Sequence, residues 1–228
     1  MDTPGPPILA CGKIWRCFNL EVKRYAFIDV PNTDGTANKF CGFSVDWGKL
    51  ALYLNAKWEC KMTFFYVGIE QGDEATAKEF EAVNKLPCAT VRTKPIFAYK
   101  QPDRRVATTC AKCGESNIAV IDMGYKKKAN CDVDLTLDAL NLVAAKTEQM
   151  FFTGDGDFAP LMRDALAKGV EKIHIVSSMK TITRLGLPPE TRFSKNLKGL
   201  LKSQPERVNF VNLDNLKFRI QKDAPAAA

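Results

Sequence analysis

The sequence contains a single histidine and no apolar run of the roughly 20 residues that a membrane helix requires. The histidine, His174, lies inside the apolar segment KIHIVSS, which is typical of a buried strand. Mechanisms that need paired histidines or a Ser-His-Asp triad are therefore disfavoured. The lack of a long apolar run predicts that the chain has no membrane partner.

The N-terminal segment MDTPGPPILACGKIW lacks the charged-then-apolar layout of a secretion signal. We expect an irregular lead over residues 1–23 and a frayed tail over residues 221–228. The eight cysteines are scattered through a chain of ordinary core composition. That distribution favours reduced thiols in the cytoplasm over a disulfide framework.

Two cysteines, Cys110 and Cys113, have the Cys-x2-Cys spacing of a zinc knuckle. A structural zinc site normally takes four ligands, and the sequence has no second pair with this spacing and no histidine pair. Cys88 and Cys131 could in principle complete a site. We favour a plain hairpin turn with free thiols and keep structural zinc as the weaker alternative.

The formal net charge is +7, which is compatible with a polyanionic partner such as RNA, because Lys and Arg can replace the counterions of phosphates. With 228 residues the chain can bury a substantial core, and one domain is the simplest organisation. The sequence leaves open a homo-oligomer or a complex with another protein.

Apolar strand-like runs alternate with segments of helical spacing along most of the chain. The expected strands are 25–31, 61–70, 89–99, 149–154, 172–178 and 207–213, and the expected helices are 47–58, 73–86, 132–147, 157–168 and 190–203. The polar stretch 101–128 breaks this rhythm and predicts a hairpin-like insertion. The alternation predicts one α/β domain over 24–220, with a mostly parallel sheet covered by helices on both faces.

The helix expected over 132–147 would bury one apolar stripe. Its members are Val133, Leu137, Leu140 and Ala144. We therefore expect these side chains to face the sheet.

Acidic residues follow two of the expected strands. Asp155 and Asp157 lie in TGDGDF, between a buried strand and a helix, and Asp29 lies near the end of the run YAFIDVP. In isolation GDGD is ordinary turn chemistry. In a parallel sheet, however, sites form outside the carboxyl ends of the strands, so Asp29 and Asp155 are expected to meet there. Converging carboxylates are what Mg²⁺ requires of a protein.

These residues match a known family: the sequence resembles the NYN domain family of PIN-like nucleases, which includes LabA-like proteins. The resemblance covers about residues 24–220, and its main segments are YAFIDVPN, RTKPIFAY, KKKANCDVDLTLDAL, FFTGDGDFAPLMRDALAKG and NFVNLDNLK. The segment TGDGDF is specific, whereas FIDVPN alone would be weak. The resemblance implies a three-layer α/β/α fold.

The resemblance also implies an activity, cleavage of RNA that depends on Mg²⁺ or Mn²⁺. Carried over position by position, the catalytic and metal-binding acids would be Asp29, Asp132, Asp155 and Asp157, and the supporting residues would be Asn32, Asp138 and Thr153. We expect single-stranded RNA as the substrate, because an open carboxylate cleft can take a flexible backbone. The choice between RNA and DNA and between endonuclease and exonuclease action stays open.

Basic residues lie next to these segments. Lys126, Lys127 and Lys128 precede the acidic helix, and Lys94 lies in RTKPIFAY. They could guide a phosphate backbone, although a charge run is more often only a solvated surface.

Two further interpretations compete with the nuclease. The segment DVDLT fits the Asp-x-Asp-x-Thr signature of haloacid-dehalogenase-like phosphatases, but the preceding KKKANC makes a poor buried strand. The family usually has a small residue, often Gly, after the first Asp, whereas this chain has Val30 followed by Pro31. If these residues narrow the site, the chain would instead be a catalytically weak RNA-binding or assembly module.

Overall fold

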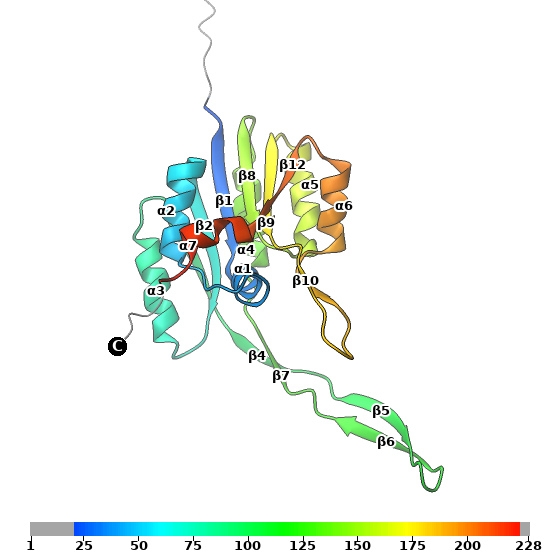
Figure 1. Ribbon diagram of the computed structural model, residues 1–228. Coiled ribbons are helices and arrows are strands. Elements are labelled where there is room, and N and C mark those ends of the chain that lie inside the picture. Colours follow the sequence, from blue (N-terminus) through cyan, green and yellow to red (C-terminus); the bar gives the residue numbers. More distant parts are fainter. Residues whose placement is uncertain (1–20, 224–228) are drawn as a thin grey trace, which may run out of the picture.

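The computed structural model describes residues 21–223, so that most of the expected lead (1–23) and part of the expected tail (221–228) lie outside the described residues. Its centre is a sheet of six parallel strands in the order β12-β9-β8-β1-β2-β3 (Figure 1). The strands are β1 (Lys23–Asp29), β2 (Cys60–Ile69), β3 (Ala89–Pro95), β8 (Thr147–Phe152), β9 (Lys172–Ser177) and β12 (Val208–Asn212).

Helices cover both faces of this sheet. One face carries α1 (Val30–Thr36), the π-helix Ala37–Cys41, α2 (Trp47–Trp58), α3 (Glu74–Asn84), the 3₁₀ turn Leu213–Leu216 and α7 (Lys217–Ile220). The other face carries α4 (Asp132–Asn141), the 3₁₀ turn Gly156–Phe158, α5 (Ala159–Ala167) and α6 (Lys195–Ser203). The predicted three-layer α/β/α fold is confirmed. Within residues 21–223, none of the helices has the length and apolar character needed to cross a membrane.

The strands are apolar on both sides because each side packs against helices. In β1, Ala26 and Ile28 belong to the first core cluster with α2 and α3, whereas Phe27 belongs to the second core cluster with α4, α5 and α6. Phe27 stacks on Phe151 of β8, with the ring centroids 5.2 Å apart. The period of two along each strand therefore fixes which side chains face which helical layer.

The strand order of the sheet changes direction at β1. From β1 the chain adds β2 and β3 on one side, and later β8, β9 and β12 on the other. Ile28 of β1 pairs with Phe152 of β8, so these two strands end side by side. The carboxyl ends of strands at such a switch point are where α/β sheets bind ligands.

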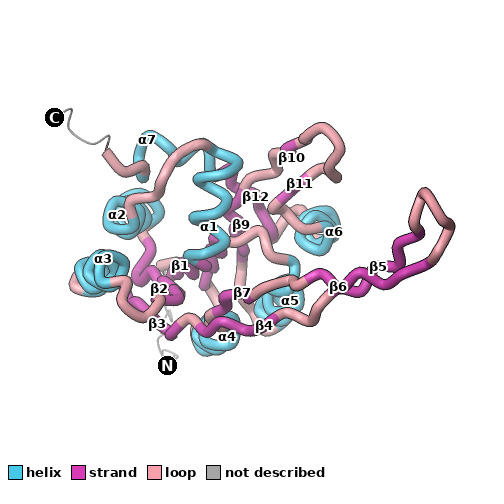
Figure 2. The backbone as a smooth tube through the Cα atoms, turned by 90° about the horizontal axis from the view of Figure 1, so that it is seen from below, coloured by secondary structure: helices cyan, strands magenta, loops and turns pink. Residues whose placement is uncertain are grey.

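A long β-ribbon, residues 97–128, projects from this end of the sheet (Figures 1 and 2). It consists of β4 (Phe97–Lys100) paired with β7 (Tyr125–Lys128), and β5 (Arg104–Thr109) paired with β6 (Ser116–Ile121). The hairpin-like insertion is confirmed, but it begins at 97 rather than 101. β3 ends at Pro95, because proline has no N–H to donate to a sheet. A smaller hairpin, β10 (Thr181–Ile182) with β11 (Glu190–Thr191), extends from the same end.

The expectations for the helix at 132–147 were wrong in two respects. The helix ends at Asn141, because the hydroxyl of Thr147, the first residue of β8, donates to the carbonyl of Ala144 at 2.5 Å and closes a tight turn. The buried residues of α4 are Leu135 and Ala139.

The predicted apolar stripe faces the sheet only in part, since Leu140 packs against the second core cluster whereas Val133 and Leu137 are each 55% exposed. The helix is instead turned so that Asp138 meets Tyr66 and Arg92 of the sheet. The last expected helix also starts later than predicted, at Lys195, where the Ser194 hydroxyl accepts the N–H of Leu197.

Candidate active site

Asp29 is the last residue of β1 and the N-cap of α1. One carboxylate oxygen accepts the N–H of Asn32 at 3.3 Å, and the other accepts the hydroxyl of Thr153 at 3.0 Å. An aspartate at an N-cap satisfies a backbone donor that the helix itself leaves unpaired. The two hydrogen bonds fix the orientation of this carboxylate at the carboxyl edge of the sheet.

The segment TGDGDF forms a turn that is tied to the same place. The N–H of Gly154 donates to Oδ1 of Asn32 at 2.9 Å, and the N–H of Asp155 donates to the Thr153 hydroxyl at 3.1 Å. Asn32 and Thr153, both predicted to be supporting residues, therefore join the turn to Asp29 through hydrogen bonds.

Both glycines of this turn lie where a side chain would not fit. A Cβ on Gly154 would lie 2.2 Å from the carbonyl oxygen of Arg192. A Cβ on Gly156 would lie 2.6 Å from the hydroxyl oxygen of Ser194. The close approach of the segment 192–194 to the turn explains the two glycines of GDGD. An ordinary exposed turn would not require them at both positions.

Three of the predicted carboxylates interact at this edge. The pKa of Asp29 is raised to about 6, mainly by burial and to a smaller degree by the negative charges of Asp132 and Asp155, against the opposing effect of the hydrogen bonds from Thr153 and Asn32. Asp132 reaches the cluster because it is the first residue of α4, and Asp155 because it follows β8. We call Asp29, Asp132 and Asp155 the acidic cluster.

The fourth predicted acid, Asp157, lies on the 3₁₀ turn beside this cluster. Its side chain is exposed, and its N–H donates to Oδ1 of Asp155 at 2.9 Å. That hydrogen bond joins the 3₁₀ turn to the Asp155 carboxylate.

Asp138 lies further along α4 than Asp132, and it contacts residues of the sheet instead of the acidic cluster. Its carboxylate accepts the Tyr66 hydroxyl at 3.0 Å and a bidentate pair from Arg92 at 3.1 and 3.2 Å. Burial and the negative charge of Asp138 raise the pKa of Tyr66. Asp138 thus binds α4, and with it Asp132, to β2 and β3. This is a supporting position.

The phosphatase interpretation requires a buried strand directly before Asp132. The structure instead has β7, an exposed strand of the ribbon, followed by the first turn of α4. This arrangement removes the basis for the Asp-x-Asp-x-Thr interpretation of DVDLT.

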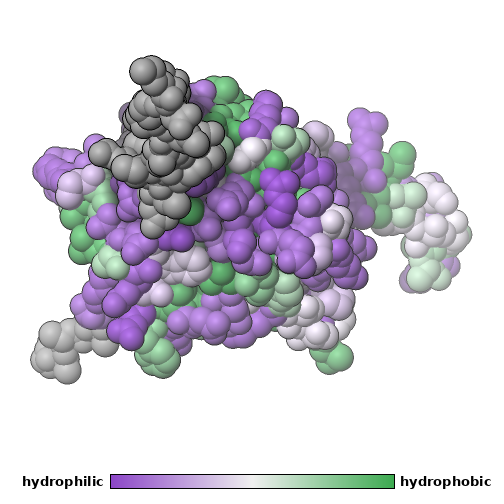
Figure 3. Space-filling view, turned by 90° about the horizontal axis from the view of Figure 1, so that it is seen from above, coloured by the Kyte–Doolittle hydropathy of each residue, from purple (hydrophilic) through white to green (hydrophobic). Residues whose placement is uncertain are grey.

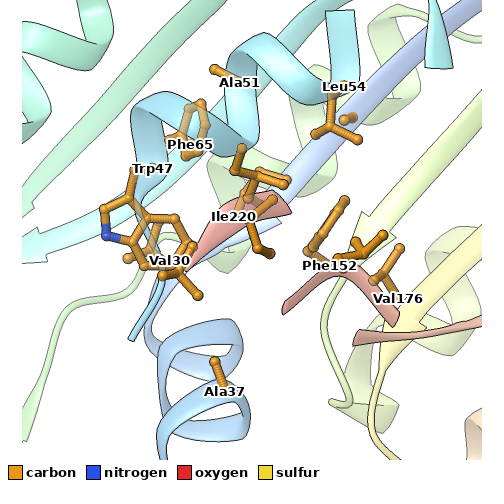
Figure 4. Packing of buried hydrophobic residues seen from close by; sticks show 14 of the residues in the cluster. Val30, Ala37, Trp47, Ala51, Leu54, Phe65, Phe152, Val176 and Ile220 are labelled. Carbon is orange, nitrogen blue, oxygen red and sulfur yellow. The ribbon is translucent and has the colours of Figure 1, made fainter. Parts of the chain in front are cut away.

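Val30 does not narrow the site. Its side chain is 6% exposed and belongs to the first core cluster (Figure 4), whereas α4, which carries Asp132, packs on the opposite face of the sheet. Pro31 is in the first turn of α1, where proline fits because its N–H would have no helical partner. The side chain of Val30 is therefore directed into the core rather than toward Asp132.

The predicted phosphate-binding lysines lie near the end of β3 and on β7 of the ribbon. Lys94, near the end of β3, donates to the carbonyl of Asn130 at 3.0 Å and pairs with Asp134 at 2.6 Å. Its pKa is raised by the hydrogen bond to Asp134 and, to a smaller degree, by the charges of Asp134, Cys131 and Asp132. Lys126 and Lys127 are exposed on β7, and Lys128 ends that strand.

The cysteines are free at all six described positions. Cys110 and Cys113 are exposed at the far turn of the ribbon, whereas Cys88 is buried in the first core cluster and Cys131 in the second. The buried pair therefore cannot complete a site with the exposed pair in this structure. The cytoplasmic location expected from the cysteines stays a prediction.

His174 is buried in β9, as predicted, and burial lowers its pKa.

The side chains as placed do not yet enclose an ion. Within residues 21–223, no group of three or more histidine, cysteine or acidic side chains is arranged to hold a metal. The donor set nevertheless fits Mg²⁺ or Mn²⁺ in chemical type, since it consists of carboxylates. The charges fit as well, because a cation would relieve the repulsion that raises the pKa of Asp29. Asp132, Asp155 and Asp157 are exposed, so their side chains can turn inward on the nanosecond scale.

Two polar residues beside the turn were not predicted. The hydroxyl of Ser177, at the end of β9, and Nε of Arg192 are buried without a hydrogen-bond partner in the described residues. Both residues adjoin Gly154. Ser177 could have been found from the sequence, because it ends a buried strand as Asp29 does. Arg192 lies in an irregular segment, where the sequence has no comparable signal.

Comparison with known proteins agrees with this geometry. The family model of the NYN domain matches residues 24–185. A crystal structure of a protein of unknown function from Vibrio parahaemolyticus RIMD 2210633 superposes with a TM-score of 0.54 at 18% identity, over 86% of this chain and 96% of that chain. At this identity the likeness concerns the fold alone. No curated protein matches the chain.

Proposed function

Because the chain belongs to the NYN domain family, whose fold is of the PIN-like nuclease type, we propose that it is a metal-dependent ribonuclease acting on single-stranded RNA. The observation that carries the proposal is the electrostatic state of Asp29. A buried carboxylate whose pKa is raised to about 6 beside two further acids is costly to maintain without a cation. Perturbed carboxylates of this kind are concentrated at functional sites.

Asp29, Asp132, Asp155 and Asp157 would hold Mg²⁺ or Mn²⁺ at the carboxyl edge of the sheet. When bound, the ion supplies Lewis acidity, which lowers the pKa of water and offsets the negative charge that develops on the phosphate oxygens. Asn32 and Thr153 keep Asp29 and the turn in register through their hydrogen bonds. Asp138 keeps Asp132 in place by anchoring α4.

The basic side chains would position the RNA backbone. Lys94 lies beside Asp132, and the electrostatic influence of that acid on its pKa supports their proximity. Lys126, Lys127 and Lys128 extend positive charge along the ribbon. Phosphate contacts of this type fix the position and direction of a strand but carry no sequence information. We therefore expect weak sequence preference from the lysines themselves.

A cleavage assay tests the proposal. A labelled single-stranded RNA is incubated with the protein and Mn²⁺ or Mg²⁺, beside an EDTA control and the variant Asp155→Asn. Asp164→Asn is the matched control, because Asp164 follows on α5 and pairs with Lys168 at 2.7 Å, away from the cluster. We expect cleavage to need the metal, to fall at least about a hundredfold in Asp155→Asn and to persist in Asp164→Asn.

The same assay separates the nuclease from the RNA-binding module. Intact RNA in every lane, from protein that retains its native circular dichroism spectrum, would reject the nuclease. RNA that is bound equally well with and without EDTA, and never cut, would identify the chain as a binding or assembly module.

A further inference from the structure

A pocket adjoins the acidic cluster at the root of the ribbon. Its volume is about 460 Å³, and it is lined by Lys94, Pro95, Phe97, Tyr99, Asn130 and Val133. Asn130 and Val133 lie on either side of Asp132 in the sequence, so the segment that lines the pocket also carries that acid. The volume lies within the range of about 300–1,000 Å³ that is typical of ligand pockets.

Two aromatic side chains dominate this pocket. Phe97 is 56% exposed and Tyr99 is 59% exposed. They are two residues apart on β4 and therefore point to the same face of the hairpin. Neither ring has a core to cover, so both present a flat apolar surface to solvent beside the proposed site of cleavage.

The hairpin of β4 and β7 has two chemically different faces. Tyr99 stands opposite Lys126 in the antiparallel register, which places a cation on the same face as the aromatic rings. The other face carries Ala98, Lys100, Tyr125 and Lys127, with Lys127 in an ion pair with Glu70 and the Lys100 ammonium 6.0 Å from the centre of the Tyr125 ring. Only the first face combines unengaged aromatic rings with the pocket.

The charge of the ribbon indicates the kind of occupant. Residues 97–128 contain seven basic and three acidic residues, so this segment contributes more than half of the net charge of +7. In Figure 3, which views the opposite end of the body, hydrophobic and hydrophilic residues lie side by side on the projecting ribbon. A basic surface with interleaved aromatic rings matches single-stranded nucleic acid, whose bases stack while its phosphates meet the cations.

We propose that Phe97 and Tyr99 form a base-stacking subsite for single-stranded RNA, with Lys126 holding a phosphate that flanks the stacked bases. The subsite rests on the proposed function, because the RNA strand that it binds would be the one that leaves the acidic cluster past Asn130. Stacking is available to every base, so the subsite favours unpaired strands over duplexes without selecting a sequence.

Equilibrium binding of a fluorescein-labelled single-stranded RNA of 12 nucleotides tests the subsite. The protein carries Asp155→Asn so that the probe stays intact. In this background Tyr99→Ala is compared with Tyr125→Ala, because Tyr125 is also more than half exposed and lies on the opposite face of the same hairpin. Loss of one stacked base corresponds to a fold-change between about 5 and 150.

We expect Tyr99→Ala to weaken binding about tenfold, Tyr99→Phe to retain it because the ring remains, and Tyr125→Ala to change it less than twofold. A probe of the same length that lacks bases should bind Tyr99→Ala as well as it binds the parent. Lys126→Ala should weaken binding more than Lys127→Ala, since Lys127 is engaged with Glu70.

Equal effects of Tyr99→Ala and Tyr125→Ala, or no effect of either, would overturn the subsite. It would also be overturned if Tyr99→Ala left RNA binding intact but dissociated a self-associated form in sedimentation, because the ribbon would then be a protein interface. Cleavage by the wild-type protein is scored separately. Tyr99-dependent binding without any metal-dependent cleavage would keep the subsite and reject the nuclease.

Discussion

The acidic cluster and the ribbon extend from the same end of the sheet, yet they are held in opposite ways. Asp29 and the turn after β8 are linked by hydrogen bonds through Asn32 and Thr153, and the residues Ala26–Ile28 of β1 and Gln149–Phe152 of β8 beneath them are buried. The ribbon has almost no buried side chain, and several of its apolar residues are more than half exposed, among them Tyr99, Ile118, Val120 and Tyr125.

This contrast fits the roles proposed for the two regions, metal binding by the acidic cluster and base stacking by the ribbon. Placing carboxylates around one ion needs a geometry fixed by its surroundings, which a packed sheet edge provides. Stacking on a flexible strand tolerates variation, and a two-stranded ribbon that buries no core costs the fold little when it moves. Stability and binding are therefore assigned to different parts of the chain, and substitutions can separate them.

The largest expected difference between the two regions is in stability. Phe151 is fully buried and stacks on Phe27, so Phe151→Ala should lower the free energy of unfolding by about 3–5 kcal/mol. Ile118, which is 62% exposed on β6, is the control, and Ile118→Ala should stay within about 0.5 kcal/mol. Urea unfolding of both variants measures the difference. A large loss in Ile118→Ala would show that the ribbon packs on something within the protein.

A smaller effect of opposite sign is expected at Asp29, where a substitution should raise the free energy of unfolding. Its pKa is raised from 3.8 to about 6 in the folded protein, so the stability it contributes is complete below about pH 4 and is lost as the pH rises through 6. Asp29→Asn cannot ionise. The metal-free variant should therefore exceed the wild type by up to about 3 kcal/mol at pH 8 and by about half as much at pH 5.

Urea unfolding in EDTA at the two pH values measures this linkage. Mn²⁺ should then stabilise the wild type at pH 8 but not Asp29→Asn, because only the ionised cluster attracts the cation. A difference between variant and wild type that is the same at pH 5 and pH 8 would contradict the assigned cause of the raised pKa.

The sequence predicted the sheet, most of its helices and the edge at which Asp29 and Asp155 meet. Those predictions depend on local periodicity and on the rule that polar residues at strand ends share one edge. The prediction of a buried stripe on the helix at 132–147 was partly wrong because a long-range contact determines which side of α4 faces the sheet. Asp138 bonds to Tyr66 and Arg92, and periodicity alone cannot reveal partners on distant strands.

The role of Val30 also depended on information that the sequence does not hold. A residue next to an aspartate at a strand end can point toward that carboxylate or away from it, and here the turn into α1 directs Val30 into the first core cluster. Likewise, the stretch 101–128 looked only polar and irregular. Its two faces, with Tyr99 and Lys126 on one and Tyr125 and Lys127 on the other, follow from a pairing register that composition does not specify.

The most direct measurement compares two neighbouring acids of α4 in single-turnover cleavage of a labelled single-stranded RNA with Mn²⁺. Asp132 belongs to the acidic cluster, whereas Asp134 pairs with Lys94 at 2.6 Å. The account predicts that Asp132→Asn lowers the cleavage rate at least about a hundredfold and that Asp134→Asn changes it less than about fivefold. Equal rates for the two variants, or a greater loss in Asp134→Asn, would contradict the claim that Asp29, Asp132 and Asp155 form the catalytic centre.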